Sequence, residues 1–154
     1  MAVTTSKWSR PAREARARLT DEERRFRDLS EADFQRQVTD LAEVLGWTWC
    51  HWRALRNSRG IWQVPVEGPL GKGWPDLTLI RVRDRRLVFA ELKREAQDPG
   101  PDQVAVLEVL GALDVALGRT PRPFELPPRV EVHVWRPSDL ADPLADSVIG
   151  RILR

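Results

Sequence analysis

Apolar residues recur every three or four positions in two stretches of the chain, and this spacing predicts two amphipathic helices. The first stretch follows Ser30, a typical helix cap, and ends at Gly46. Its apolar positions are Phe34, Val38, Leu41 and Leu45. The second stretch starts at the helix-initiating run 99–102, and its apolar positions are Val106, Val109 or Leu110, Leu113 and Leu117. Weaker signals predict a short helix over 20–28 and a final helical segment over 137–153.

Alternating or continuous apolar runs between these helices predict strands over 47–53, 61–64, 77–82, 87–93 and 130–135. The charged turn 83–86 joins the third and fourth of these strands into a hairpin, whereas the Gly- and Pro-rich segments 66–73 and 118–128 are predicted loops. The element order α-β-β-β-β-α-β-α predicts an α/β fold with a mixed sheet covered by helices. We expect a crossover helix between the last two strands.

The length and composition favour one globular domain over residues 30–154, preceded by a basic arm with a short helix over 1–29. No apolar run approaches the roughly 18 residues that span a bilayer, so we expect no membrane partner and a cytoplasmic location. Cys50 is the only cysteine, which excludes an internal disulfide and argues against a structural zinc site. We interpret Cys50 as a small buried residue, and Trp47, Trp49 and Trp135 as core tryptophans.

Basic charge is concentrated in the middle of the chain, although the net charge of the whole chain is only +2. Residues 51–94 contain ten basic and four acidic residues, a local net charge of +6. Of the 25 basic residues 22 are arginine, which suits bidentate phosphate contacts but is equally explained by a GC-rich genome. The concentration of charge indicates a phosphate-binding surface around residues 51–94.

The central segment also carries the candidate chemistry. Side chains alternate across a strand, so Glu91 and Lys93 share one face with Leu87 and Phe89. A carboxylate and an ammonium at the end of an apolar strand are costly to bury unless they are compensated. Because the hairpin brings Asp76 to the same end of the sheet, a divalent cation held by Asp76 and Glu91 would provide that compensation.

The backbone carbonyl of Leu92 would add a third metal ligand, and Lys93 would orient the attacking water or stabilise the developing charge. The structural alternative is a surface ion pair between Glu91 and Lys93 on an edge strand, with Asp76 as an ordinary turn residue. The order of these residues, their flanking strands and the local +6 charge favour the metal site.

The chain resembles the VRR-NUC nucleases of the PD-(D/E)XK superfamily over about residues 30–141, most closely the small stand-alone members from phages and bacteria. The matching pattern consists of Gly73, Pro75, Asp76, Glu91, Leu92, Lys93, Gln103, and the closing Val132, Val134, Trp135, Arg136 and Pro137. The resemblance implies a restriction-endonuclease-like mixed β-sheet core flanked by helices. It also implies a Mg²⁺- or Mn²⁺-dependent DNA nuclease, and some members of the family act on branched DNA. The loop 118–128 and the N-terminal arm depart from the pattern.

The resemblance implies further site residues. Glu31 would assist the metal, through water, or would only stabilise its helix terminus, and Gln35 on the same helix face is a substitute. Gln103 would contact a metal-bound water or the DNA backbone, or would be an ordinary polar residue of a first helical turn. The glycines around Lys72 would let the backbone approach DNA or metal closely. The expected DNA contacts are Lys72, Trp74, His51, Arg53, Arg56, Arg59 and Arg94.

These observations predict a metal-dependent DNA endonuclease in which Asp76, Glu91, Lys93, Glu31 and Gln103 form the active site. The alternative is a non-catalytic DNA-binding module that retains the nuclease fold. A chain that needs a partner subunit for activity is a third reading. Small enzymes of this superfamily are often dimers, because cutting two strands requires two sites, so a homodimer stays an open expectation.

Overall fold

The computed structural model describes residues 7–8, 29–53, 55–63, 67–118, 129–140 and 147–154, without the side chains of 63 and 114–118. The chain divides into two compact units. The first unit comprises Met1–Thr48, Leu92–Pro99 and Val134–Arg154, and the second comprises Trp49–Glu91 and Gly100–His133. The helix predicted over 20–28, most of the basic arm and the loop 119–128 lie outside the described residues.

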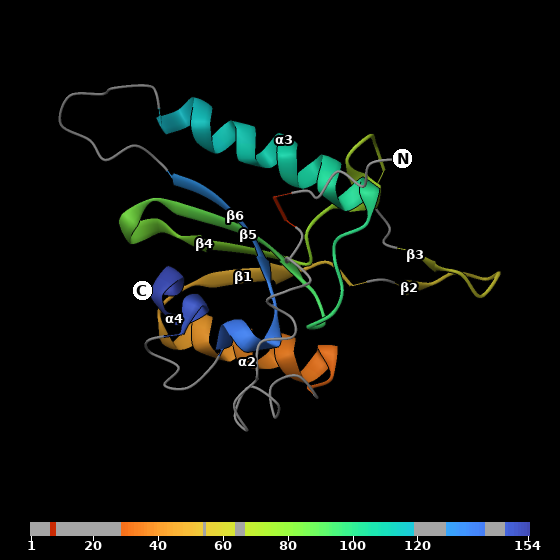
Figure 1. Ribbon diagram of the computed structural model, residues 1–154, viewed down its shortest axis with the longest axis horizontal. Helices are drawn as coiled ribbons and strands as arrows, with labels where there is room; N and C mark the ends of the chain where they lie inside the picture. Colours follow the sequence, from red (N-terminus) through yellow and green to blue (C-terminus); the bar gives the residue numbers. More distant parts are fainter. Residues whose placement is uncertain (1–6, 9–28, 54, 64–66, 119–128, 141–146) are drawn as a thin grey trace. The chain divides into compact units, whose positions relative to one another are not determined.

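Helices and strands follow the predicted order except for one additional short strand, β2, which the sequence did not predict (Figure 1). The helices are α2 (Glu31–Val44), α3 (Pro101–Gly118) and α4 (Val148–Leu153). The strands are β1 (Thr48–His51), β2 (Leu55–Arg56), β3 (Trp62–Gln63), β4 (Leu77–Arg81), β5 (Arg86–Leu92) and β6 (Arg129–Trp135). Single 3-10 turns are η2 (Gly71–Gly73), η3 (Val82–Asp84) and η4 (Pro137–Leu140). The last predicted helical segment therefore contains two elements, η4 and α4, with residues 141–146 between them outside the described part.

Four of the described strands form one mixed sheet in the order β1-β4-β5-β6. Strands β4 and β5 are antiparallel, with Leu77 opposite Ala90 and Arg81 opposite Arg86. Strand β6 runs parallel to β5, because the amide of Arg129 bonds the carbonyl of Arg85 and the amide of Lys93 bonds the carbonyl of Trp135. Helix α3 connects these parallel strands, so the predicted α/β class, hairpin and crossover helix are confirmed.

The core of the first unit is built around α2. Ser30 caps this helix by accepting a hydrogen bond from the amide of Asp33, as the sequence predicts. Phe34 and Val38 are buried, and the left-handed backbone of Gly46 (φ 79°) follows the helix end. The indole Nε1 of Trp47 donates to the carbonyl of Leu153 at 2.7 Å, which satisfies the polar atom of a buried tryptophan.

The core of the second unit lies between α3 and the strands over which this helix runs in Figure 1. Phe89 of β5, Val130 of β6, and Val106 and Leu110 of α3 form a buried cluster. Leu70, Trp74, Leu87 and Val132 pack against this cluster. The face of β5 that carries Leu87 and Phe89 therefore points toward α3, which decides the direction of every side chain along this strand.

Three sequence predictions about burial are wrong. Cys50 is exposed rather than buried, because β1 is an edge strand and Cys50 lies on its more accessible face together with Thr48. Trp49 is only partly buried, and Leu113 is exposed, whereas Leu107 is fully buried. Of the alternatives Val109 and Leu110, Leu110 is the buried residue. The buried stripe of α3 consists of Val106, Leu107 and Leu110, which turns Val109 outward.

None of the helices in the described part of the chain is long and apolar enough to cross a membrane.

Candidate active site

Glu91 is a fully buried carboxylate on an interior strand. Its side chain is 0% exposed, and β5 lies between β4 and β6 in the sheet. The alternative of a surface pair on an edge strand is therefore wrong for Glu91. An ionised carboxylate in such a position requires nearby donors or a cation, because desolvation without compensation costs several kcal/mol, on the order of 5 or more.

Asp76 lies beside Glu91 at the end of the hairpin. Leu77 pairs with Ala90, so Asp76 and Glu91 occupy the next positions of the antiparallel register. Opposite residues of such a pair project from the same face, with Cα atoms about 5 Å apart. The carbonyl of Asp76 also accepts a hydrogen bond from the amide of Trp52 at 3.1 Å, which fixes the Asp76 backbone beyond the end of β1. Asp76 is partly exposed, so the two carboxylates differ in their access to solvent.

Gln103 joins the start of α3 to Glu91. The sequence Gly100-Pro101-Asp102-Gln103 places Gln103 at the third helical position, where its Oε1 accepts from the Gly100 amide at 2.9 Å. Because Oε1 is an acceptor there, the side-chain Nε2 is the donor that bonds Oε1 of Glu91. Gln103 is therefore both a first-turn cap and a direct partner of the buried carboxylate.

Gly73 brings the turn η2 into close contact with the start of α3. A Cβ added at Gly73 would lie 2.8 Å from the amide nitrogen of Gln103 and would overlap the carbonyl group of Asp102. The sequence suggested that this glycine lets the backbone approach DNA or a metal, whereas here it admits the helix backbone. Lys72 in the same turn is exposed, with Nζ 3.9 Å from Oδ2 of Asp102.

Trp74 packs against the core of the second unit. Its ring meets Phe89 edge to face, with centroids 5.5 Å apart and planes at 86°. This packing gives Trp74 a structural role, and its expected contact with DNA stays a prediction. It also anchors the chain two residues before Asp76, so Gly73 and Trp74 together set the direction in which the Asp76 segment enters β4.

The remaining expected active-site residues belong to the first unit. Lys93 is partly exposed, and its amide donates to the carbonyl of Trp135 at 3.0 Å, so β6 holds the backbone next to Leu92 in extended form. Glu31 lies exposed in the first turn of α2, and Gln35 is partly exposed one turn later. Their roles at the metal stay predictions from the sequence.

The expected DNA contacts are mostly accessible. Arg53, Arg59 and Arg94 are exposed, and His51 is half-buried on the same face of β1 as Trp49. Arg56 is exposed but also structural, because its Nε donates to the carbonyl of Gly60 at 3.0 Å. Arg53 lies beyond the end of β1, so this strand does not fix the direction of its side chain.

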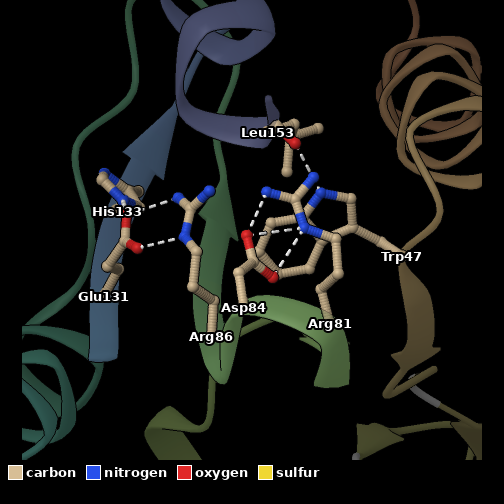
Figure 2. A network of polar contacts seen from close by, with 7 residues as sticks. All are labelled: Trp47, Arg81, Asp84, Arg86, Glu131, His133 and Leu153. Atoms are coloured by element: carbon tan, nitrogen blue, oxygen red, sulfur yellow. Dashed lines mark hydrogen bonds and ion pairs between the residues drawn. The ribbon is translucent and has the colours of Figure 1, made fainter. Parts of the chain in front are cut away.

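Sequence reasoning missed an ionic network on the strands of the second unit (Figure 2). Arg86 of β5 bonds both carboxylate oxygens of Glu131 on β6, at 2.7 and 2.9 Å, and His133 lies 3.5 Å from Glu131. Burial raises the pKa of Glu131, but hydrogen bonds from His133 and Arg86 and the charge of Arg86 outweigh it and lower the pKa to about 2. Nearby, the side-chain hydrogen bond from buried Arg81 lowers the pKa of Asp84.

The hairpin register places Asp76 next to Glu91, and the Gln103 amide holds the Glu91 carboxylate. Carboxylate oxygens are the ligands that a hard divalent cation prefers. Among the described residues there is no group of three or more His, Cys, Asp or Glu side chains arranged to bind a metal. A cation here would therefore complete its shell with backbone carbonyls and water.

Comparisons of this chain with protein-family models, with curated proteins and with solved structures give no match.

Proposed function

We propose that this protein is a Mg²⁺- or Mn²⁺-dependent nuclease that hydrolyses phosphodiester bonds in DNA. The observation that carries the proposal is the environment of Glu91, a fully buried carboxylate held by Gln103 with Asp76 next to it in the hairpin register. A buried carboxylate next to a second acidic residue is an arrangement that a divalent cation between them would stabilise.

The carboxylates of Asp76 and Glu91 suit such an ion and would be its charged ligands. The sequence pattern adds the Leu92 carbonyl as a neutral ligand, and the family resemblance adds Glu31 as a contributor through water. When bound, the cation neutralises charge on the phosphate and activates a water molecule. Gln103 keeps the Glu91 carboxylate in one orientation, since its own orientation is fixed by the Gly100 amide.

Lys93 completes the proposed chemistry from its place two residues after Glu91. Its ammonium carries three N–H donors, which would orient the attacking water and stabilise charge on the phosphate oxygens in the transition state. DNA would be held by the basic segment 51–94, with exposed Lys72 and arginines on phosphates. The mixed sheet with its crossover helix is compatible with a restriction-endonuclease-like core, so we extend the proposal to the VRR-NUC type.

The test is a panel of labelled DNA substrates (single-stranded, duplex, flap and four-way junction) incubated with Mg²⁺, Mn²⁺ or EDTA. We expect cleavage with either metal and none with EDTA. Asp76→Ala and Lys93→Ala are expected to abolish cleavage while DNA affinity stays within about twofold, and exposed Glu108→Ala serves as the matched control. Metal-dependent cutting by purified Lys93→Ala would contradict the role of Lys93. Tight DNA binding without cleavage of any substrate would favour the non-catalytic module.

A further inference from the structure

The two-stranded ribbon formed by β2 and β3 presents an exposed aromatic residue among arginines. Arg56 pairs with Trp62, and Leu55 pairs with Gln63. Trp62 is 68% exposed and Leu55 is 57% exposed, although large apolar side chains are normally covered. In Figure 1 the ribbon extends away from β4 and β5 of the same unit, so these strands do not cover it.

Hydrogen bonds fix the conformation of the turn that connects β2 and β3. The Asn57 side chain accepts from the amides of Arg59 and Ile61 at 3.0 and 2.9 Å, and the Asn57 and Ile61 backbones are hydrogen bonded at 2.9 Å. Gly60 has φ 77°, the left-handed conformation that the turn requires. The ribbon therefore presents its side chains from a defined backbone, which lowers the entropy lost on binding.

The pairing register of β2 and β3 determines which side chains share a face of the ribbon. Residues directly opposite in an antiparallel pair share a face, so Arg56 and Trp62 lie together and Leu55 lies on the other side. Arg59 lies at the tip, and Arg53 precedes the ribbon. The sequence from His51 to Val66 contains these three arginines and no acidic residue. An exposed tryptophan beside a guanidinium, in a locally cationic segment, matches the chemistry of an unpaired nucleic-acid strand.

We infer that the β2–β3 ribbon binds unpaired bases of the DNA substrate, with Trp62 stacked on a base and Arg56 and Arg59 on flanking phosphates. This inference rests on the proposed function, because it names the part of a DNA substrate that the ribbon recognises. Stacking requires an open base face, which an intact duplex does not offer along its length. Binding by the ribbon would therefore give the protein a preference for single-stranded or branched DNA over intact duplex.

The test measures binding by fluorescence anisotropy in EDTA, so that cleavage plays no part. Labelled flap, single-stranded and blunt duplex DNA are compared for the wild type, Trp62→Ala, Trp62→Phe and Trp62→Leu. We expect Trp62→Ala and Trp62→Leu to lower affinity for flap and single-stranded DNA about tenfold, Trp62→Phe to retain most of it, and the duplex affinity to change less than about twofold. The control is Val82→Ala, which removes a side chain that is 82% exposed at the far end of β4.

Equal affinity of all variants for flap DNA, or an equal loss for flap and duplex DNA, would overturn the inference. So would light scattering that shows a wild-type dimer and a Trp62→Ala monomer, because the ribbon would then pair two copies. Failure of the inference differs from failure of the proposed function. If the protein cleaves DNA and Trp62→Ala leaves its DNA affinity unchanged, only the role of the ribbon is refuted. If Trp62→Ala weakens flap binding but the wild type cleaves no substrate, only the nuclease activity is refuted.

Discussion

Gly73 and Asp102 approach each other so closely that no side chain fits between them. A Cβ at position 73 would overlap the Asp102 carbonyl, which belongs to the first turn of α3. The same turn of α3 carries Gln103, and the chain after Gly73 carries Asp76. This contact therefore fixes how closely the segment that leads to Asp76 approaches the helical turn that carries Gln103.

Replacement of Gly73 by alanine is expected to destabilise the protein. The added methyl group meets backbone atoms rather than a flexible side chain, so the cost is that of overpacking, about 1–3 kcal/mol. Thermal unfolding should shift down by several degrees, roughly 2–4 °C per kcal/mol for a chain of this size. Gly100→Ala is the matched control, because a Cβ there would lie 3.8 Å from Gln103 Oε1, an ordinary contact distance. Equal melting temperatures for the two variants would refute the close approach.

Gln103 is expected to act as a positioning residue for Glu91. Gln103→Ala should lower cleavage about 10- to 100-fold and raise the Mg²⁺ concentration needed for half-maximal activity, as for other residues that orient a metal ligand. Gln103→Glu retains the acceptor for the Gly100 amide but places a negative charge against Glu91. We expect its melting temperature to be low in EDTA and to recover with Mg²⁺ more than that of the wild type.

Exposed Glu108→Ala in the same helix is the control for both variants. A Gln103→Ala protein with unchanged Mg²⁺ dependence but lower melting temperature would mean that the residue only caps α3.

Glu131 should make stability depend on pH. Its pKa is lowered from 4.5 to about 2 in the folded protein. A depressed carboxyl pKa contributes stability that is fully present above the unfolded value and is lost as the pH falls toward the folded value. The loss should therefore occur between about pH 4.5 and pH 2. Glu131→Gln is expected to lower the free energy of unfolding by about 2 kcal/mol at pH 7 and to have little effect near pH 2.

Urea unfolding of the wild type, Glu131→Gln and the exposed control Glu108→Gln across this pH range measures the effect. A difference between the wild type and Glu131→Gln that is the same at both pH values would show that the carboxylate charge is not responsible.

Much of the fold was predictable because its signals are local. The hairpin follows from two apolar strands joined by a charged turn, and its register then places Asp76 beside Glu91 without any long-range assumption. The cap at Ser30 was equally readable. The exposure of Cys50 was not, because an apolar run does not reveal which strand lies at the edge of a sheet.

The ionic network of β5 and β6 could not be predicted from the sequence either. Strict alternation in β6 indicated one apolar and one polar face, and Val130 is indeed buried in the core. The polar face nevertheless carries Glu131 in a bidentate bond with Arg86, 45 positions earlier in the chain. That pairing depends on the register of two parallel strands, which no local pattern encodes.

The most direct test of the central claim is the binding of Mn²⁺, followed by electron paramagnetic resonance, to the wild type and to Asp76→Asn, Glu91→Gln and Glu108→Gln. We predict that the wild type binds Mn²⁺ in competition with Mg²⁺, that Asp76→Asn and Glu91→Gln each weaken binding at least about tenfold, and that Glu108→Gln binds as the wild type does. Equal Mn²⁺ affinity in all four proteins, or no binding by the wild type, would contradict a cation site at Asp76 and Glu91.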